Sequence, residues 1–244
     1  MLVDVVLLPR DLTPDHLRDR SCVVFDVLRA TTTMTAALAA GVAEVRLFES
    51  LDAARAAAEH ANGNRVLCGE RACLPPEGFD LGNSPGQFGA VHRGATLFMC
   101  TTNGTRALLA ARAAAATFAG ALVNAAAVAR VLAAEGRDVT LLCAGTDGQV
   151  AMEDFLGAGA VLDALGPAAV PGSDVAGSAL VSFQAARDDL GTLLRETEGG
   201  RNVIAAGLEA DIDFAARLSV LDVVGIAAGD PLAVRAWDSG SARP

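Results

Sequence analysis

The chain has 244 residues, 52% of them hydrophobic, and a formal net charge of −10. Such an acidic chain lacks the broad basic surface that attracts nucleic acids and anionic membranes, so we expect neither as a partner. No uncharged run is apolar enough to span a bilayer, and the first residues lack the basic segment of a signal peptide, so we expect a cytoplasmic protein.

Short apolar runs alternate with Ala-rich helical runs over the first two thirds of the chain. The predicted strands cover residues 3–8, 22–26, 42–48, 66–68, 95–100, 117–123 and 139–143. The predicted helices cover residues 33–40, 51–61, 125–135 and 152–165, with one more helix after the sequence TTNGTR. This alternation predicts α/β layers around a mixed, largely parallel sheet.

The last third of the sequence is more helical. We predict an amphipathic helix over residues 178–196, a break at Gly199-Gly200, two short helices over residues 202–206 and 210–218, and a last strand over residues 220–226. No segment has the length or the Pro/Ser/Gly content of a linker, so we expect residues 1–244 to form a single compact chain.

A long segment without regular periodicity, residues 69–94, separates two of the predicted strands. It is rich in Gly and Pro, but it also holds the aromatic residues Phe79 and Phe88 and several acids. Loops of this length inside a compact domain are usually either disordered or functional. The aromatic residues favour an ordered loop, and we therefore predict that it contributes to a functional site.

Polar and charged side chains follow four of the predicted strands. They are Asp26 with Arg29, Glu70 with Arg71, the run from Thr101 to Arg106, and the run from Ala144 to Gly148. Ligands of α/β proteins gather outside the carboxyl ends of strands. We therefore expect these four segments to form one site.

Threonines and carboxylates give this site two candidate tasks. The hydroxyl groups of Thr31, Thr32, Thr101, Thr102 and Thr105 are either helix caps or donors to a phosphoryl oxygen, and Asn103-Gly104 permits a close backbone approach to an oxyanion. Asp26, Glu70 and Asp80 are candidate ligands of a hard cation such as Mg²⁺. Glu153 and Asp154, at a helix start, are explained more simply as partners of the helix dipole.

Several other chemistries are excluded by what the sequence lacks. The five cysteines form no CxxC pair, and the three histidines show neither zinc-type spacing nor a hydrolase triad. Leu28 stands where haloacid-dehalogenase phosphatases carry a second aspartate, and TTNGTR lacks the glycine spacing and the lysine of a Walker A loop. Chemistry must rest on carboxylates, arginines, hydroxyls and backbone amides.

The motifs taken together resemble the 2-phosphosulfolactate phosphatase family. The matching blocks are DVLRATTT (26–33), GER (69–71), EGFDLGNSP (77–85), TTNGTRA (101–107), CAG (143–145), MEDFLGAGA (152–160), GLEADIDF (207–214) and DVV (222–224). The resemblance implies Mg²⁺-dependent hydrolysis of 2-phospho-3-sulfolactate, a step of coenzyme M biosynthesis. It also implies two similar, intertwined α/β/α units. One departure is Ala72-Cys73, where the family usually has glycines.

On this resemblance we predict a role for each candidate residue. Mg²⁺ would be held by Asp26 with Glu70 and Asp80. Arg29, Arg106 and the two Thr-rich helix starts would neutralise the phosphoryl oxygens, and Arg71 would meet the sulfonate or carboxylate end of the substrate. The sequence leaves open whether Asp26 itself or a metal-bound water attacks phosphorus, and whether the protein is a homodimer. Another small phosphorylated hydroxy acid as substrate, and a non-catalytic anion sensor, remain the alternatives.

Overall fold

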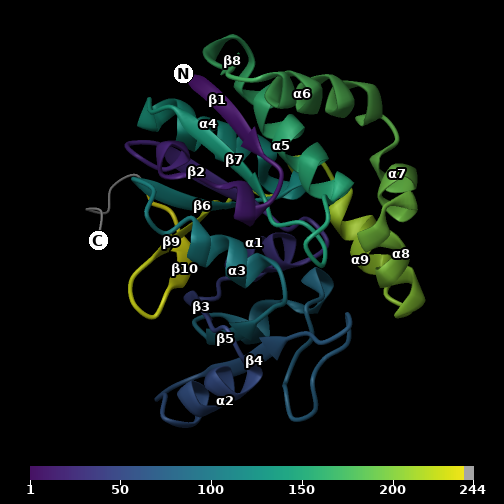
Figure 1. The fold of residues 1–244 in the computed structure, drawn as a ribbon. Helices are drawn as coiled ribbons and strands as arrows, with labels where there is room; N and C mark the ends of the chain where they lie inside the picture. The colour runs from purple at the N-terminus through teal and green to yellow at the C-terminus, as the bar shows by residue number, and fades with distance from the viewer. Residues whose placement is uncertain (239–244) are drawn as a thin grey trace.

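The computed structural model describes residues 1–238, and within them ten strands form one sheet (Figure 1). Their order is β4-β5-β3-β10-β9-β6-β2-β7-β1-β8. The strands are β1 (Leu2–Val6), β2 (Ser21–Phe25), β3 (Glu44–Leu47), β4 (Arg65–Gly69), β5 (Thr96–Cys100), β6 (Ala116–Gly120), β7 (Val139–Cys143), β8 (Val170–Pro171), β9 (Gly225–Ala228) and β10 (Ala233–Ala236).

The sheet consists of two parallel blocks joined by an antiparallel hairpin. One block holds β4, β5 and β3, and the other holds β6, β2, β7, β1 and β8. Strands β9 and β10 connect the blocks through antiparallel pairings only, so the two blocks run in opposite directions. Strand β2 lies inside its block, with Phe25 between Gly120 and Cys143. Its five residues are all buried, which explains its unbroken apolar sequence.

Helices cover both faces of this sheet. They are α1 (Ala30–Ala39), α2 (Leu51–Glu59), α3 (Gly104–Ala110), α4 (Ala125–Glu135), α5 (Met152–Leu165), α6 (Asp174–Ala186), α7 (Leu190–Glu196), α8 (Glu198–Ala205) and α9 (Glu209–Ala215). Alternate residues of β2 enter two separate cores: Val23 and Phe25 pack with α4, α5 and α6, whereas Cys22 and Val24 pack with α1 and α3. The predicted α/β/α layering is thereby confirmed.

The chain passes twice between the two blocks. Helix α1 leads from β2 in one block to β3 in the other, and α3 leads from β5 back to β6 (Figure 1). The starts of these two helices are the two Thr-rich segments singled out in the sequence. That the blocks are two similar units stays a prediction. No helix within residues 1–238 is long and apolar enough to cross a membrane.

The predictions for the last third of the chain were partly wrong. The single helix over residues 178–196 is in fact α6 and α7, and α6 begins earlier because the Ser173 hydroxyl accepts the Ala176 N–H at 3.3 Å. Gly199 and Gly200 lie inside α8 instead of breaking the chain. The strand predicted over residues 220–226 begins only at Gly225, and its partner β10 was not predicted.

Candidate active site

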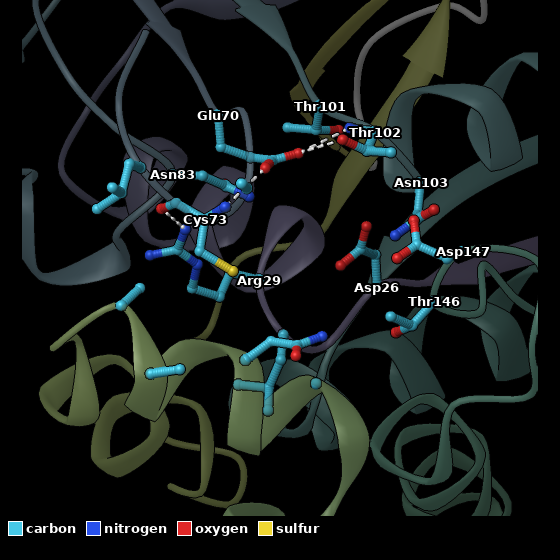
Figure 2. Close-up of a pocket in the computed structure, with 17 residues that line it drawn as sticks. Asp26, Arg29, Glu70, Cys73, Asn83, Thr101, Thr102, Asn103, Thr146 and Asp147 are labelled. Carbon is cyan, nitrogen blue, oxygen red and sulfur yellow. Dashed lines mark hydrogen bonds between the residues drawn. The ribbon is translucent and has the colours of Figure 1, made fainter.

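A cavity of about 470 Å³ lies where four strands end (Figure 2). Asp26 and Arg29 follow β2, Glu70 follows β4, Thr101, Thr102 and Asn103 follow β5, and Thr146 and Asp147 follow β7. These are the four segments that the sequence predicted to meet. Helix α8 adds Gly199 and Asn202 to the wall. In Figure 2, Glu70, Asn83, Cys73 and Arg29 lie on one side, and Asp26, Asn103, Asp147 and Thr146 on the other.

Asp26 connects the end of β2 with the start of α1. Its carboxylate oxygen Oδ1 accepts the Ala30 N–H at 3.1 Å, and only 7% of the residue is exposed. Burial, with a smaller contribution from the negative charges of Glu70 and Glu153, raises the pKa of Asp26 to about 6 against the opposing effect of the Ala30 N–H. A carboxylate held in this way is poised to exchange a proton or to bind a cation.

Gly104 brings the second Thr-rich segment against Asp26. A Cβ atom at Gly104 would lie 2.6 Å from the Ala30 Cβ and 2.8 Å from Asp26 Oδ2. The Gly104 N–H also lowers the pKa of Asp26 because it stabilises the ionised carboxylate. The two segments therefore meet at Asp26, and glycine is the residue that permits the contact.

Replacing Gly104 by alanine is expected to disable the site without unfolding the protein. The added methyl group must displace Asp26 or α1, and overpacking of this kind costs about 1–3 kcal/mol of stability. A shift of a reacting group by about 1 Å typically lowers activity roughly 100-fold. Gly177→Ala is the matched helical control, because a Cβ there meets no atom within 4 Å. Phosphate-release assays and thermal unfolding of both variants test this; equal activity of Gly104→Ala and Gly177→Ala would contradict it.

Glu70 ties the ends of β4 and β5 together at the cavity wall. Its Oε1 accepts the Thr102 N–H at 3.0 Å and the Thr102 hydroxyl at 2.6 Å, and its Oε2 accepts the Cys73 N–H at 3.2 Å. The tight turn after it is closed by Arg71 and Leu74, and Ala72 and Cys73 have positive φ angles of 51° and 66°. Glycine adopts such angles freely, so Ala72 and Cys73 place two side chains in a strained turn that lines the cavity.

Arg29 is held on several sides at once. Its Nη1 donates to Asp211 Oδ2 at 2.5 Å and to Ser84 Oγ at 3.1 Å, and its Nη2 donates to the Cys73 carbonyl at 2.5 Å (Figure 2 shows the last of these). The residue is 3% exposed and still lines the cavity. Within the described part of the chain it is the one cationic side chain that does so.

Two further acids lie behind Asp26. Asp154 on α5 accepts the Val27 N–H at 2.8 Å and the Gly145 N–H at 3.0 Å, so it fixes the backbone just beyond β2 and β7. Burial, with the charges of Asp26 and Glu153, holds the pKa of Asp154 well above its usual range. Glu153 is 1% exposed, and its Oε2 has no hydrogen-bond partner among the described residues. Asp154 thus does more than complement a helix dipole, because it also holds the backbone at Val27 and Gly145.

Three predicted charged residues lie away from this cavity. The Asp80 carboxylate accepts the Leu67 N–H at 2.8 Å and does not line the cavity. Arg106 is exposed on α3 and does not line it either. Arg71 is exposed beside a different hollow, which it shares with Arg55 and Asp52. None of the three lines the cavity with Asp26, Glu70 and Arg29.

The predicted threonines divide into two groups. The Thr31 hydroxyl donates to the Asp26 carbonyl at 2.9 Å and the Thr32 hydroxyl to the Val27 carbonyl at 2.8 Å, and both residues are fully buried. The side chains of Thr101 and Thr105 cap each other's N–H groups at 3.2 Å. Of the predicted hydroxyl residues, Thr101 and Thr102 line the cavity.

Some residues at this site were not predicted individually. Asn83 and Cys73 line the cavity, and Ser84 and Asp211 hold Arg29. A signal existed for three of them, since Asn83 and Ser84 belong to EGFDLGNSP and Asp211 to GLEADIDF. Asp147 lies in a strand-end segment that was predicted as a whole.

Comparison with known proteins gives a consistent result. Residues 6–230 match the family described as 2-phosphosulpholactate phosphatase. A probable 2-phosphosulfolactate phosphatase of Carboxydothermus hydrogenoformans is 38% identical over 92% of this chain and 92% of its own length. Proteins of the same description are 40% identical in Deinococcus radiodurans, over 86% of this chain and 88% of theirs, and 41% identical in Synechococcus sp., over 83% and 86%. The chain therefore belongs to the 2-phosphosulpholactate phosphatase family.

Proposed function

We propose that this protein is a phosphatase that uses Mg²⁺ to hydrolyse the phosphate ester of 2-phospho-3-sulfolactate to sulfolactate and phosphate. Membership of the family supports the reaction class and the substrate. The observation that carries the proposal is the cavity itself, in which Asp26, Glu70 and Arg29 come together from two strand ends. A role of the protein in coenzyme M biosynthesis, its cytoplasmic location and its assembly as a homodimer remain predictions.

The charge of the cavity supports the need for a cation. Asp26, Glu70 and Asp147 line it, and the one cationic lining side chain in the described chain, Arg29, is already paired with Asp211. A phosphate ester that also carries a carboxylate and a sulfonate would be repelled by these acids. We therefore expect binding to require more positive charge than Arg29 alone supplies.

The donor atoms fit Mg²⁺. This ion takes oxygen ligands, commonly one or two carboxylates, and completes its shell with water and substrate phosphate. Asp26 and Glu70 both line the cavity, and no group of three or more acidic, thiol or imidazole side chains in residues 1–238 forms a complete metal cage. We propose Asp26 and Glu70 as the ligands. When bound, the ion would neutralise charge on the phosphoryl oxygens.

The protein's own groups supply position and charge for the reaction. In the hydrolysis, a water oxygen bonds to phosphorus and the bond from phosphorus to the sulfolactate oxygen breaks. Asp26 is fixed by the Ala30 and Gly104 N–H groups, and Arg29 offers its guanidinium to an oxyanion. Groups fixed before the substrate arrives stabilise a phosphoryl transition state without reorganisation. Labelled-water incorporation and fluoroberyllate trapping separate a nucleophilic Asp26 from a metal-binding one.

Removal of divalent cations is expected to abolish phosphate release. After treatment with EDTA, turnover of 2-phospho-3-sulfolactate should fall at least about 100-fold and return on addition of Mg²⁺, since the lining acids then lack a counter-charge. Full activity without a divalent cation would contradict the proposed metal dependence.

A panel of phosphate monoesters tests the substrate. Phospholactate and phosphoglycolate lack the sulfonate and serve as matched controls. The specific reason to test them is the Ala72-Cys73 turn, which changes the cavity wall relative to the family pattern. If the protein hydrolysed esters with and without the sulfonate equally well, another phosphorylated hydroxy acid would be favoured as the substrate. Binding of every ester with Mg²⁺ but release of no phosphate would favour an anion sensor.

A further inference from the structure

The guanidinium of Arg29 lies where three distant segments meet. The Cys73 carbonyl comes from the turn after β4, Ser84 from the long loop, and Asp211 from α9. The Ser84 hydroxyl also donates to Asp211 Oδ2 at 2.7 Å, so one carboxylate oxygen receives both Arg29 and Ser84. Asp211 is 6% exposed and Ser84 is 7% exposed, and neither lines the cavity. They therefore cannot touch a substrate there.

The hydrogen bonds of Arg29 leave two of its N–H donors for a ligand. An arginine has five N–H donors in a fixed plane. Three are used within the described chain, two of Nη1 and one of Nη2, which leaves the Nε–H and one Nη2–H. Nε and Nη2 lie on the same edge, the geometry that binds two oxygens of a phosphate or carboxylate together.

We propose that Asp211, assisted by Ser84, is a positioning residue that orients Arg29 so that its Nε/Nη2 edge faces the oxyanion in the cavity. This inference rests on the proposed function. A free arginine side chain has several rotatable bonds and loses entropy when it binds a ligand. Arg29 is already held by Asp211, Ser84 and Cys73 before the substrate arrives, so that loss is incurred on folding and not on binding.

The ion pair also explains why a nearly buried arginine is stable in this place. A buried charge without a partner is strongly destabilising, whereas a buried charge with a close counter-ion and further hydrogen bonds is tolerated. The Arg29–Asp211 distance of 2.5 Å and the three acceptors meet that condition. The negative charge of Asp211 at the same time weakens the pull of Arg29 on free anions, which fits a site whose substrate arrives together with a cation.

Helix α9 offers a matched control for the test. Asp213 lies two residues after Asp211 on the same helix, forms an ion pair with Arg195, and is exposed. The substitutions Asp211→Asn and Asp213→Asn therefore remove the same charge from the same helix, in one case beside Arg29 and in the other at the surface.

The experiment measures kcat/KM with Mg²⁺ and the affinity for inorganic phosphate by calorimetry. Asp211→Asn should lower kcat/KM by about 10- to 100-fold, the range found for outer partners of active-site groups, whereas Asp213→Asn should retain wild-type values. Ser84→Ala, which keeps the ion pair between Arg29 and Asp211, should lower kcat/KM several-fold. Unfolding temperatures of all variants identify any that fail to fold, and Ser84→Ala then carries the test.

A double-substitution cycle with Arg29→Met separates positioning from a merely structural role. If Asp211 acts through Arg29, then Asp211→Asn should cost little further activity or phosphate affinity once Arg29 is gone. The proposal would be overturned if the fold-losses of Asp211→Asn and Arg29→Met multiplied in the double variant. It would also be overturned if Asp211→Asn were as active as Asp213→Asn. If the wild type does not hydrolyse 2-phospho-3-sulfolactate, the proposed substrate fails, and the phosphate titrations still decide the role of Asp211.

Discussion

Asp26→Asn is expected to abolish phosphatase activity and at the same time to stabilise the metal-free protein at pH 8. Activity should fall by at least about 100-fold, because the variant loses the carboxylate that the other groups of the site surround. Burial raises the pKa of Asp26 to about 6, so the folded protein holds this group ionised at pH 8 at a cost in free energy. Asparagine keeps an acceptor for the Ala30 N–H and carries no charge.

The size of the stabilisation expected from Asp26→Asn depends on pH. The folded protein binds the Asp26 proton more tightly than the unfolded chain, whose pKa is near 3.8. The stabilisation this gives is fully present below about pH 4 and is lost as pH rises through about 6. Each pKa unit corresponds to about 1.4 kcal/mol, so the variant should gain about 3 kcal/mol at pH 8 and almost nothing at pH 4.

Urea unfolding at both pH values, without divalent cations, measures this difference. Asp147→Asn is the control, because Asp147 lines the same cavity but is exposed. The free energy of unfolding of this variant should match that of the wild type at both pH values. Added Mg²⁺ should stabilise the wild type and not Asp26→Asn, since a ligand stabilises only the state that binds it. An equal stability difference at pH 4 and pH 8 would contradict the argument.

The sequence was sufficient to predict the site residues that follow directly after a strand. Asp26, Glu70, Thr101 and Thr146 each follow a buried strand, and the rule that ligands gather at strand ends correctly predicted that their segments meet. The segments meet although the two blocks run in opposite directions.

Side-chain direction and long-range contacts were not predictable in this way. Arg106 and Thr105 are neighbours on α3, yet one points to solvent and the other into the protein. Asp211 is 182 positions from Arg29, and no pattern in the sequence indicates that the two will pair. The same holds for β10, which is placed by pairing with β3 and β9.

The Gly199-Gly200 pair shows how a glycine can be misread. Glycine pairs usually interrupt helices, because glycine loses more backbone entropy on folding than any other residue. Here both lie in the first turn of α8, which the Thr197 hydroxyl caps by accepting the Gly200 N–H at 3.0 Å. A Cβ at Gly199 would lie 1.9 Å from Glu153 Oε1, and one at Gly200 would lie 1.8 Å from the Leu194 carbonyl oxygen. Close packing, and not flexibility, requires them.

Gly200→Ala is accordingly expected to be among the most destabilising single methyl additions in this chain. The atom in its way is a backbone oxygen of α7, which cannot move like the end of a side chain, so α7 and α8 must separate. Overpacking usually costs about 1–3 kcal/mol, and a backbone clash should reach the upper end. Because Gly199 and Asn202 of α8 line the cavity, KM should rise as well.

Unfolding in urea and steady-state kinetics test both parts of this prediction. Gly191→Ala on α7 is the matched control, since its nearest neighbour would be an Arg195 nitrogen at 3.5 Å, an ordinary contact. At Gly191 the added methyl group should leave the free energy of unfolding unchanged or raise it by up to about 1 kcal/mol, because alanine has a higher helix propensity than glycine. If Gly200→Ala behaved like Gly191→Ala, α8 would not need to lie so close to α7, and glycine at this position would have to be explained by the flexibility that its sequence pattern first indicates.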